Sequence, residues 1–192
     1  MRQAGIVSVL GGSAPAPGSP AYQEAYTLGR LLAEAGYTVA SGGYSGTMEA
    51  VSRGAAEAGG HVIGVTTDRL NRWEARTIHP NPWVREEIRF PTLRERLIHL
   101  ITFSDALIAL RGGIGTLSEV SLAWSLMQVG EIAVRPLILV GESWGALLRQ
   151  FYGNGEYIRD KDMRLWQCVD GPAAAVAVLN GHTEADKEQD HA

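Results

Sequence analysis

One stretch near the middle of the chain, residues 104–130, constrains the fold more than any other part of the sequence. Its first part, Asp105 to Leu110, is a short apolar run of the kind that forms a buried parallel strand. A glycine-rich turn follows at Gly112 to Gly115, and Thr116 then opens an amphipathic run that ends near Gly130. This order of strand, glycine loop and helix start predicts an anion site, because the loop and the helix N-terminus both present backbone N–H groups. We expect phosphate to be that anion.

Strand and helix patterns alternate along the rest of the chain. Short apolar runs predict strands near residues 5–10, 37–40, 61–65, 84–88, 105–110, 136–140 and 165–169. Amphipathic runs between them predict helices near residues 22–35, 48–58, 92–102, 116–130, 144–151 and 172–179. The alternation predicts an α/β fold with a parallel sheet that is wound right-handedly.

The length of 192 residues suits a single domain with a full-sized core. We assign that domain to residues 1–180. Residues 181–192 are polar and lack periodicity, so we expect them to form a disordered tail. Residues 66–90 are also less regular, and apart from the strand near 84–88 we expect them to form a loop.

Composition limits the classes of partner. The formal net charge of −4 leaves no basic footprint for nucleic acid, so we expect no nucleic-acid partner. Cys168 is the only cysteine, which excludes an internal disulfide bond and a multi-cysteine metal cluster. No apolar run approaches the roughly 20 residues of a membrane span, and the N-terminus lacks the apolar segment of a signal peptide. We therefore expect a soluble cytoplasmic protein with no bound metal.

Three of the predicted strands end in a glycine pair and lead into a helix. These strands end at Leu10, Ser41 and Leu110. In an open α/β sheet the carboxyl ends of the strands meet at the ligand crevice, so the three loops would form a phosphate-binding floor under a nucleotide-sized ligand. The candidate binding residues of these loops are Gly12, Ser13, Gly42, Gly43, Gly46, Gly112, Gly113, Ile114, Gly115 and Thr116. The alternative is that the glycines only permit tight turns and close packing.

None of the three loops carries a dinucleotide or nucleoside-triphosphate fingerprint. The first loop lacks the G-x-G-x-x-G spacing, and G-x-x-x-x-G-K-[ST] occurs nowhere in the chain. Oxidoreductase and kinase functions therefore have no motif in their favour.

The central loop does resemble a family signature. Residues 111–119, which read RGGIGTLSE, resemble the PGGxGTxxE motif of the LOG ("Lonely Guy") family, once called lysine-decarboxylase-like. Arg96 lies where that family carries the arginine of its other motif, and residues 42–48 resemble its GGGxxGLMG loop. The dipeptide Gly12-Ser13 occupies the place of its first-loop GSS. The resemblance covers roughly residues 5–150 with matched order and spacing.

The resemblance implies a Rossmann-like, doubly wound, mostly parallel sheet with helices on both faces, and a homodimer. It also implies hydrolysis of the N-glycosidic bond of an AMP-like nucleoside 5′-monophosphate, which releases the base and ribose 5-phosphate without a cofactor. In plants and some microbes the base is a cytokinin. Other proteins with this fold bind a nucleotide or the molybdenum cofactor, a pterin, without cleaving it, and that alternative stays open.

Arg96 and Glu119 are the catalytic residues that the resemblance implies. Cleavage of a ribosyl bond passes through an oxocarbenium-like state, which a nearby carboxylate stabilises. Glu119 follows the phosphate loop by one helical turn, and Arg96 would orient its carboxylate. Thr116 and Glu119 also fit a capping box, in which Glu119 would only bond a backbone N–H of the cap. Arg94 is a rival to Arg96 because it lies two positions away.

Three positions depart from the family pattern. Arg111 replaces the family's proline, Leu97 replaces the lysine after the catalytic arginine, and Ser118 replaces a second acidic residue. These changes bear on the substrate more than on the fold. The homodimer would use an apolar patch on the helix after the phosphate loop, formed by Trp124, Leu126 and Met127.

Overall fold

Seven parallel strands form the central sheet of the structure, a computed structural model that describes residues 5–68, 79–153 and 155–189. The sheet order is β4-β3-β2-β1-β5-β6-β7, and every neighbouring pair of strands is parallel. The strands are β1 (Ile6–Leu10), β2 (Thr38–Ser41), β3 (Val62–Thr67), β4 (Glu86–Phe90), β5 (Ala106–Ala109), β6 (Leu137–Val140) and β7 (Gln167–Val169). Because β1 pairs with β2 on one side and with β5 on the other, the topological switch point lies between β1 and β5.

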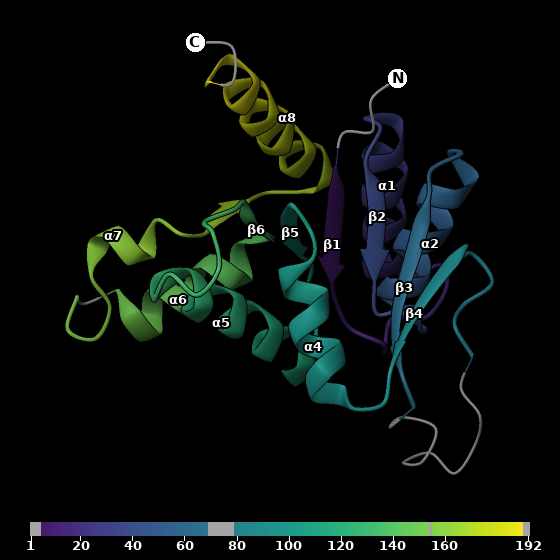
Figure 1. Cartoon of the computed structure of the whole chain (residues 1–192), viewed down its shortest axis with the longest axis horizontal. Coiled ribbons are helices and arrows are strands. Elements are labelled where there is room, and N and C mark those ends of the chain that lie inside the picture. The colour runs from purple at the N-terminus through teal and green to yellow at the C-terminus, as the bar shows by residue number, and fades with distance from the viewer. Residues whose placement is uncertain (1–4, 69–78, 154, 190–192) are drawn as a thin grey trace.

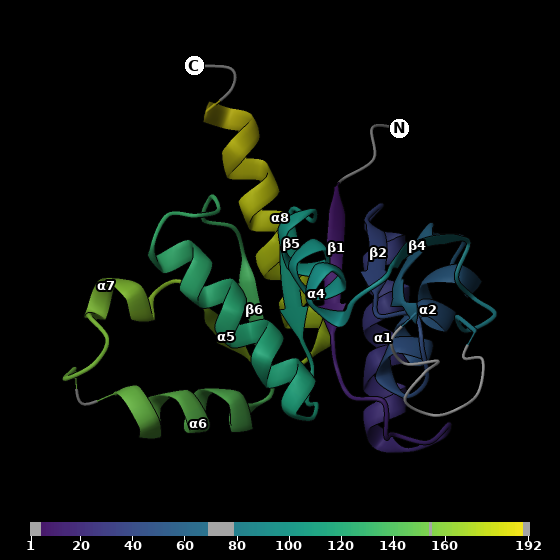
Figure 2. The ribbon, with the colours of Figure 1, turned by 60° about the horizontal axis from the view of Figure 1, so that its bottom comes forward.

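Helices cover both faces of this sheet (Figure 1), and the turned view separates the two helix layers (Figure 2). One face carries α1 (Pro20–Glu34), α2 (Thr47–Glu57) and α8 (Pro172–Gln189). The other face carries α4 (Leu93–Thr102), α5 (Ile114–Gln128), α6 (Glu142–Tyr152) and the short α7 (Asp160–Met163). This is the Rossmann-like, doubly wound α/β arrangement that the sequence predicts. Among the described residues, no helix combines the length and the apolar run that crossing a lipid bilayer requires.

Both faces of the sheet are buried, and successive strand residues point to opposite faces. In β1, Val9 packs on the side of α1 and α2, whereas Leu10 packs on the side of α4 and α5. Ser8 is also fully buried in β1, and its Oγ donates to the carbonyl of Leu100 at 2.7 Å. A strand that is covered on both faces needs apolar residues at nearly every position, which explains the unbroken apolar runs of the sequence.

Helices α1 and α2 approach each other so closely that glycine is required on each of them. A Cβ atom on Gly29 of α1 would overlap the carbonyl oxygen of Val51 on α2. In the same way, a Cβ atom on Gly54 of α2 would overlap the carbonyl oxygen of Tyr26 on α1. The two backbones are therefore in direct contact, and this contact fixes the position of α2 relative to α1.

The main differences from the sequence prediction lie toward the C-terminus. Helix α7 is not predicted, and α8 continues to Gln189, through a segment for which we expected a disordered tail. The extension has a local cause, because residues 183–189 are rich in alanine, glutamate, lysine and glutamine, which favour helix without needing an apolar face. Residues 190–192 lie outside the described residues, as do residues 69–78 of the expected loop.

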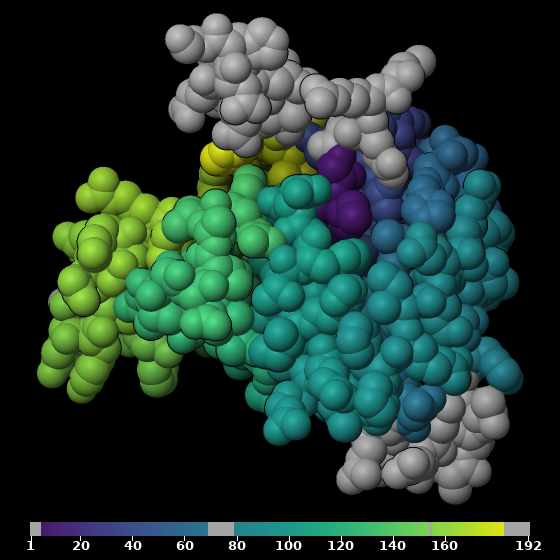
Figure 3. All heavy atoms as spheres, viewed as in Figure 1, coloured from purple at the N-terminus to yellow at the C-terminus, as the bar shows by residue number. Residues whose placement is uncertain are grey.

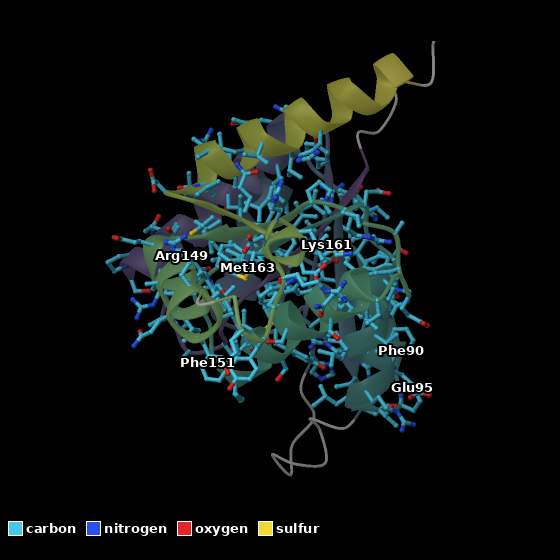
Figure 4. The ribbon with its side chains drawn as sticks, turned by 90° about the vertical axis from the view of Figure 1, so that its left-hand side faces the viewer. Phe90, Glu95, Arg149, Phe151, Lys161 and Met163 are labelled. Carbon is cyan, nitrogen blue, oxygen red and sulfur yellow. The ribbon has the colours of Figure 1, made fainter. Side chains whose placement is uncertain are left out.

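The predicted dimer patch on α5 is wrong in two of its three residues. Atoms of α4 and α5 cover this face of the sheet (Figure 3), but Trp124 and Met127 are only 5% and 3% exposed. Part of the cover comes from α7, since Nε1 of Trp124 donates to the carbonyl of Asp162 at 2.8 Å. Figure 4 views the molecule from the side of α6 and α7, where Phe151 of α6 is 69% exposed.

Candidate functional site

A cleft of about 640 Å³ opens at the carboxyl ends of the strands, beside the switch point between β1 and β5. It is lined by the loops that follow β1, β2 and β5 and by residues from segment 79–82. Arg96 and Glu119 also line it. Six of the predicted binding residues lie on its surface, namely Gly12, Ser13, Gly113, Ile114, Gly115 and Thr116. The structure therefore brings the three loops and the predicted charged pair to one place.

The other predicted binding residues, Gly42, Gly43, Gly46 and Gly112, are not among the described residues that line the cleft; they let its walls pack together. A Cβ atom on Gly46 would lie 2.5 Å from the carbonyl oxygen of Gly12, and the φ of +72° at Gly46 also favours glycine. A Cβ atom on Gly112 would overlap the side chain of Thr116. For these glycines the packing alternative describes what the structure has.

The first loop is fastened to the start of α2 by hydrogen bonds. The backbone N–H and the Oγ1 hydroxyl of Thr47 each donate to the carbonyl of Gly12 at 2.9 Å. The hydroxyl of Ser45 donates to the carbonyl of Ser13 at 3.2 Å. These bonds hold the first loop in place, and its residues Gly11, Gly12 and Ser13 line the cleft beside Ser45.

Helix α5 presents an open N-terminus to the cleft. Its N-cap is Gly113, which supplies no side-chain hydrogen bond, and its first turn contains no acidic residue. Ile114, the first helical residue, is 79% exposed. The first N–H groups of an α-helix have no partner within the helix, so this end offers backbone donors and the positive end of the helix dipole to an anion.

Arg96 and Glu119 form a buried ion pair at the cleft. Helix α4 carries Arg96 and α5 carries Glu119, and Nη1 of the arginine donates to Oε1 of the glutamate at 3.1 Å. Nε of Arg96 donates to the carbonyl of Val65 at 3.0 Å, which fixes the plane of the guanidinium. The two residues are 8% and 6% exposed. The rival Arg94 is exposed instead.

The capping interpretation of Glu119 is wrong. The N-cap of α5 is Gly113 rather than Thr116, because the helix begins two residues earlier than the sequence predicts. The Glu119 carboxylate then lies in the second turn and bonds Arg96. Burial raises the pKa of Glu119 above its ordinary value, and the charge and hydrogen bond of Arg96 oppose that rise.

Gly42 makes room for the arginine of this pair. A Cβ atom on Gly42 would overlap Nη2 of Arg96, and it would lie 2.5 Å from the sulfur of Met48. The second glycine loop therefore serves the charged pair by packing beneath it, although the sequence assigned Gly42 to the ligand. Met48 itself lines the cleft.

Asn81 is a cleft residue that the sequence analysis missed. Its backbone N–H donates to the carbonyl of Gly43 at 2.7 Å, and its Nδ2 donates to the carbonyl of Tyr44 at 3.1 Å. Its Oδ1 accepts the N–H of Trp83 at 3.2 Å. Asn81 thus ties segment 79–82 to the second glycine loop. The only signal in the sequence is an asparagine between two prolines, which predicts a turn and not a site.

Glu49 is the second missed residue, and it places another carboxylate on the cleft. It lies in the first turn of α2, and its Oε1 accepts a hydrogen bond from the hydroxyl of Tyr22 at 3.1 Å.

Among the described residues, no group of three or more histidine, cysteine, aspartate or glutamate side chains is arranged to hold a metal ion.

Residues 48–179 match the family model described as "Possible lysine decarboxylase". The chain belongs to this family. This LOG-family chain is 38% identical to the cytokinin riboside 5′-monophosphate phosphoribohydrolase LOG of Oryza sativa subsp. japonica over 111 residues. The alignment covers 57% of this chain and 44% of the rice protein. The alignments of this chain with four curated relatives, the rice protein among them, cover between 39% and 63% of the relatives' own lengths.

Solved structures resemble the chain over nearly all of its length. The molybdenum cofactor binding protein of Rippkaea orientalis has a TM-score of 0.72 and 26% identity, and the match covers 92% of this chain and 95% of that one. The molybdenum cofactor carrier protein of Chlamydomonas reinhardtii has a TM-score of 0.71 and 25% identity, covering 94% of this chain and 98% of that one. The proteins that this chain resembles thus include sequence relatives named as phosphoribohydrolases and structural neighbours named as molybdenum cofactor binding or carrier proteins.

Proposed function

We propose that this LOG-family protein binds a nucleoside 5′-monophosphate in the cleft and hydrolyses its N-glycosidic bond. The observation that carries the proposal is the buried ion pair of Arg96 and Glu119, which lies in the same cleft as the open N-terminus of α5. A phosphate bound at Gly113 to Thr116 would place the ribose near the second turn of α5, which carries Glu119.

Glu119 is the group that stabilises the reacting sugar. As the bond between C1′ and the base nitrogen breaks, positive charge develops on the ribose ring, and a carboxylate beside the ring stabilises that charge. A water molecule adds its oxygen to C1′, and its proton leaves with the base. Arg96 holds the carboxylate in one orientation, because Nη1 bonds Glu119 while Nε is fixed by Val65. The reaction requires no metal or cofactor.

The names of the sequence relatives support this reaction class. The rice relative is named as a phosphoribohydrolase of cytokinin riboside 5′-monophosphate, and its match with this chain reaches 38% identity. Arg111, Leu97 and Ser118 depart from the family motif, and the proposal therefore names the reaction class and leaves the base to the substrate panel below.

A second candidate function is binding without cleavage. The structures that match nearly the whole chain are named as a binding protein and a carrier protein of the molybdenum cofactor. That cofactor is a pterin which carries a phosphate, so the α5 N-terminus would serve it in the same way as a nucleotide. In this function the chain would hold its ligand on the glycine loops and release it intact.

Base release from a panel of nucleoside 5′-monophosphates, followed by chromatography, separates the two functions. We expect release by the wild type and a loss of at least about 100-fold in the Glu119→Ala variant, since a carboxylate that stabilises the transition state contributes that much or more. Thermal shift should show that the variant still binds nucleotide. Nucleotide binding without release by the wild type would favour the carrier function.

The homodimer implied by the family resemblance stays a proposal. With Trp124 and Met127 buried, the large apolar side chains that α4 and α5 expose are Leu93, Ile98 and Ile114, which are 48%, 40% and 79% exposed. A dimer would have to use surface of this kind rather than the predicted patch.

A further inference from the structure

We propose that Glu49 selects the ligand by its base, and that the base is one with a 2-amino-4-oxopyrimidine edge, as in guanine and pterin, rather than adenine. This inference rests on the proposed function of the cleft as a site for a phosphorylated base. In this inference, the Glu49 carboxylate contacts the base and accepts hydrogen bonds from it.

The Glu49 carboxylate has unused capacity to accept hydrogen bonds. Oε1 accepts one bond from the hydroxyl of Tyr22, and within the described parts of the chain Oε2 has no hydrogen-bond donor. A carboxylate offers about four acceptor positions, so both oxygens can still receive an N–H group. Arg53 lies one turn further along α2, where its Nε bonds Glu57 at 2.9 Å and its guanidinium also interacts with the Tyr22 hydroxyl.

Two polar side chains that line the cleft together with Glu49, those of Asn81 and Tyr44, are already committed to the protein. The amide of Asn81 donates to Tyr44 and accepts from Trp83. The hydroxyl of Tyr44 donates to the carbonyl of Thr67 at 3.2 Å and accepts its N–H at 2.9 Å. Of these three side chains, the Glu49 carboxylate is therefore the one with hydrogen-bonding capacity left for a ligand, and that capacity is to accept. The matching ligand edge is one that carries donors.

Guanine and pterin carry such an edge. The ring N–H, which is N1–H in guanine and N3–H in pterin, lies beside the 2-amino group and points in the same direction, so one carboxylate can accept from both. Adenine presents an amino donor next to a ring-nitrogen acceptor. A carboxylate cannot donate to that nitrogen and would leave it unsatisfied, which costs binding free energy.

The position of Glu49 relative to the phosphate site fits this assignment. The N-terminus of α5, without an acidic residue, and the first turn of α2, with Glu49, line the cleft from two different helices. A ligand with an anionic phosphate and a donor-rich base is complementary to this pair of ends. Reversing the ligand would bring phosphate against a carboxylate.

The chain offers a matched control on the same two helices. Tyr26 and Glu57 repeat the tyrosine–glutamate bond between α1 and α2, with the hydroxyl of Tyr26 donating to Oε2 of Glu57 at 2.7 Å. Glu57 is at the last turn of α2, away from the cleft. Glu49→Gln and Glu57→Gln therefore make the same chemical change at two tyrosine-bonded glutamates; only Glu49 lies on the cleft, and Glu57 also bonds Arg53.

Isothermal titration of GMP, IMP, AMP and ribose 5-phosphate tests the inference. We expect the wild type to bind GMP at least about 10-fold more tightly than AMP, with IMP between them because it lacks the 2-amino group. Glu49→Gln should reduce the lead of GMP over AMP to less than about threefold, since a glutamine amide pairs with adenine as readily. Glu57→Gln should keep the wild-type order, and ribose 5-phosphate should bind all three proteins equally.

Further measurements distinguish a pterin ligand from a guanine ligand, and they show whether this inference or the proposed function is contradicted. Tighter binding of 6-hydroxymethylpterin than of guanosine, with the same loss in Glu49→Gln, would support the inference and identify pterin as the source. AMP binding as tight as GMP in the wild type, or a lead of GMP that survives Glu49→Gln, would overturn this inference alone. If neither ribose 5-phosphate nor any nucleotide binds, the proposed function fails together with it.

Discussion

Helices α2 and α5 both begin at the cleft, directly after a glycine-rich loop, but their N-termini differ. Helix α5 starts from Gly113 with no side-chain cap and no acidic residue in its first turn. Helix α2 starts from Gly46, also without a side-chain cap, but its first N–H, from Thr47, bonds Gly12 and its first turn contains Glu49. The first helix start can receive an anion, while the second already holds one. The Glu49 side chain and the bonded N–H of Thr47 together make the α2 start different from the α5 start.

The glutamates that the two helices bring to the cleft also differ in their partners. Glu119 of α5 is almost fully buried and is paired with the charged Arg96. Glu49 of α2 is half-buried and accepts from the neutral hydroxyl of Tyr22. A buried charge depends on its partner far more than a half-exposed one does. The following three predictions use this difference, beginning with the largest expected effect.

Removing the partner should cost much more at the α5 end than at the α2 end. We expect Arg96→Ala to lower the free energy of unfolding by about 3–5 kcal/mol, because it leaves the Glu119 carboxylate buried without a counter-charge. Tyr22→Phe should cost only about 1 kcal/mol, the usual value for one lost hydrogen bond. Urea unfolding of the two variants measures both values. Equal losses of unfolding free energy in the two variants would contradict the burial of the Glu119 carboxylate away from water.

The pH dependence of stability should carry the signature of Glu119. Its pKa in the folded chain is raised by burial above the ordinary value of 4.5, so the unfolded chain releases this proton first as the pH rises. The contribution of Glu119 is therefore fully present below pH 4.5 and is lost as the pH rises through the raised pKa. Urea unfolding of wild type and Glu119→Gln between about pH 4 and 8 should show this decline only in the wild type. Base release should follow the opposite course, with an acid limb above pH 4.5, because the reaction needs the ionised carboxylate.

An acidic residue in the first turn of α5 should make that end resemble α2. We expect Ile114→Glu to weaken nucleotide binding by about two- to fivefold at low salt, which is the usual strength of a charge at a helix terminus. The same change should leave the fold stable or slightly more stable, because a negative charge suits a helix N-terminus and Ile114 is 79% exposed. Ile114→Gln is the uncharged control, and calorimetry at low and high salt measures both. A weakening that high salt fails to reduce would argue against phosphate at this end.

Local sequence patterns predict most of the fold and part of the candidate site. The sequence predicts the loops after β1, β2 and β5 because strand, glycine pair and helix are contiguous in each. It cannot decide which glycines face the ligand, since Gly42 and Gly46 owe their roles to Arg96 and to the first loop. Asn81 and Glu49 acquire their positions from contacts with distant segments, so no local signal marks them. The choice between a capping and an ion-paired Glu119 likewise needed the neighbouring helix α4.

The contact between Gly29 and Gly54 has a consequence for the energetics of recognition. Because α1 and α2 meet backbone to backbone, Tyr22 on one and Glu49 on the other belong to a single rigid body. A ligand that reaches this wall meets a carboxylate whose orientation was set during folding. The entropy of ordering that side chain is then lost before any ligand arrives, so base discrimination at this wall is preorganised rather than induced.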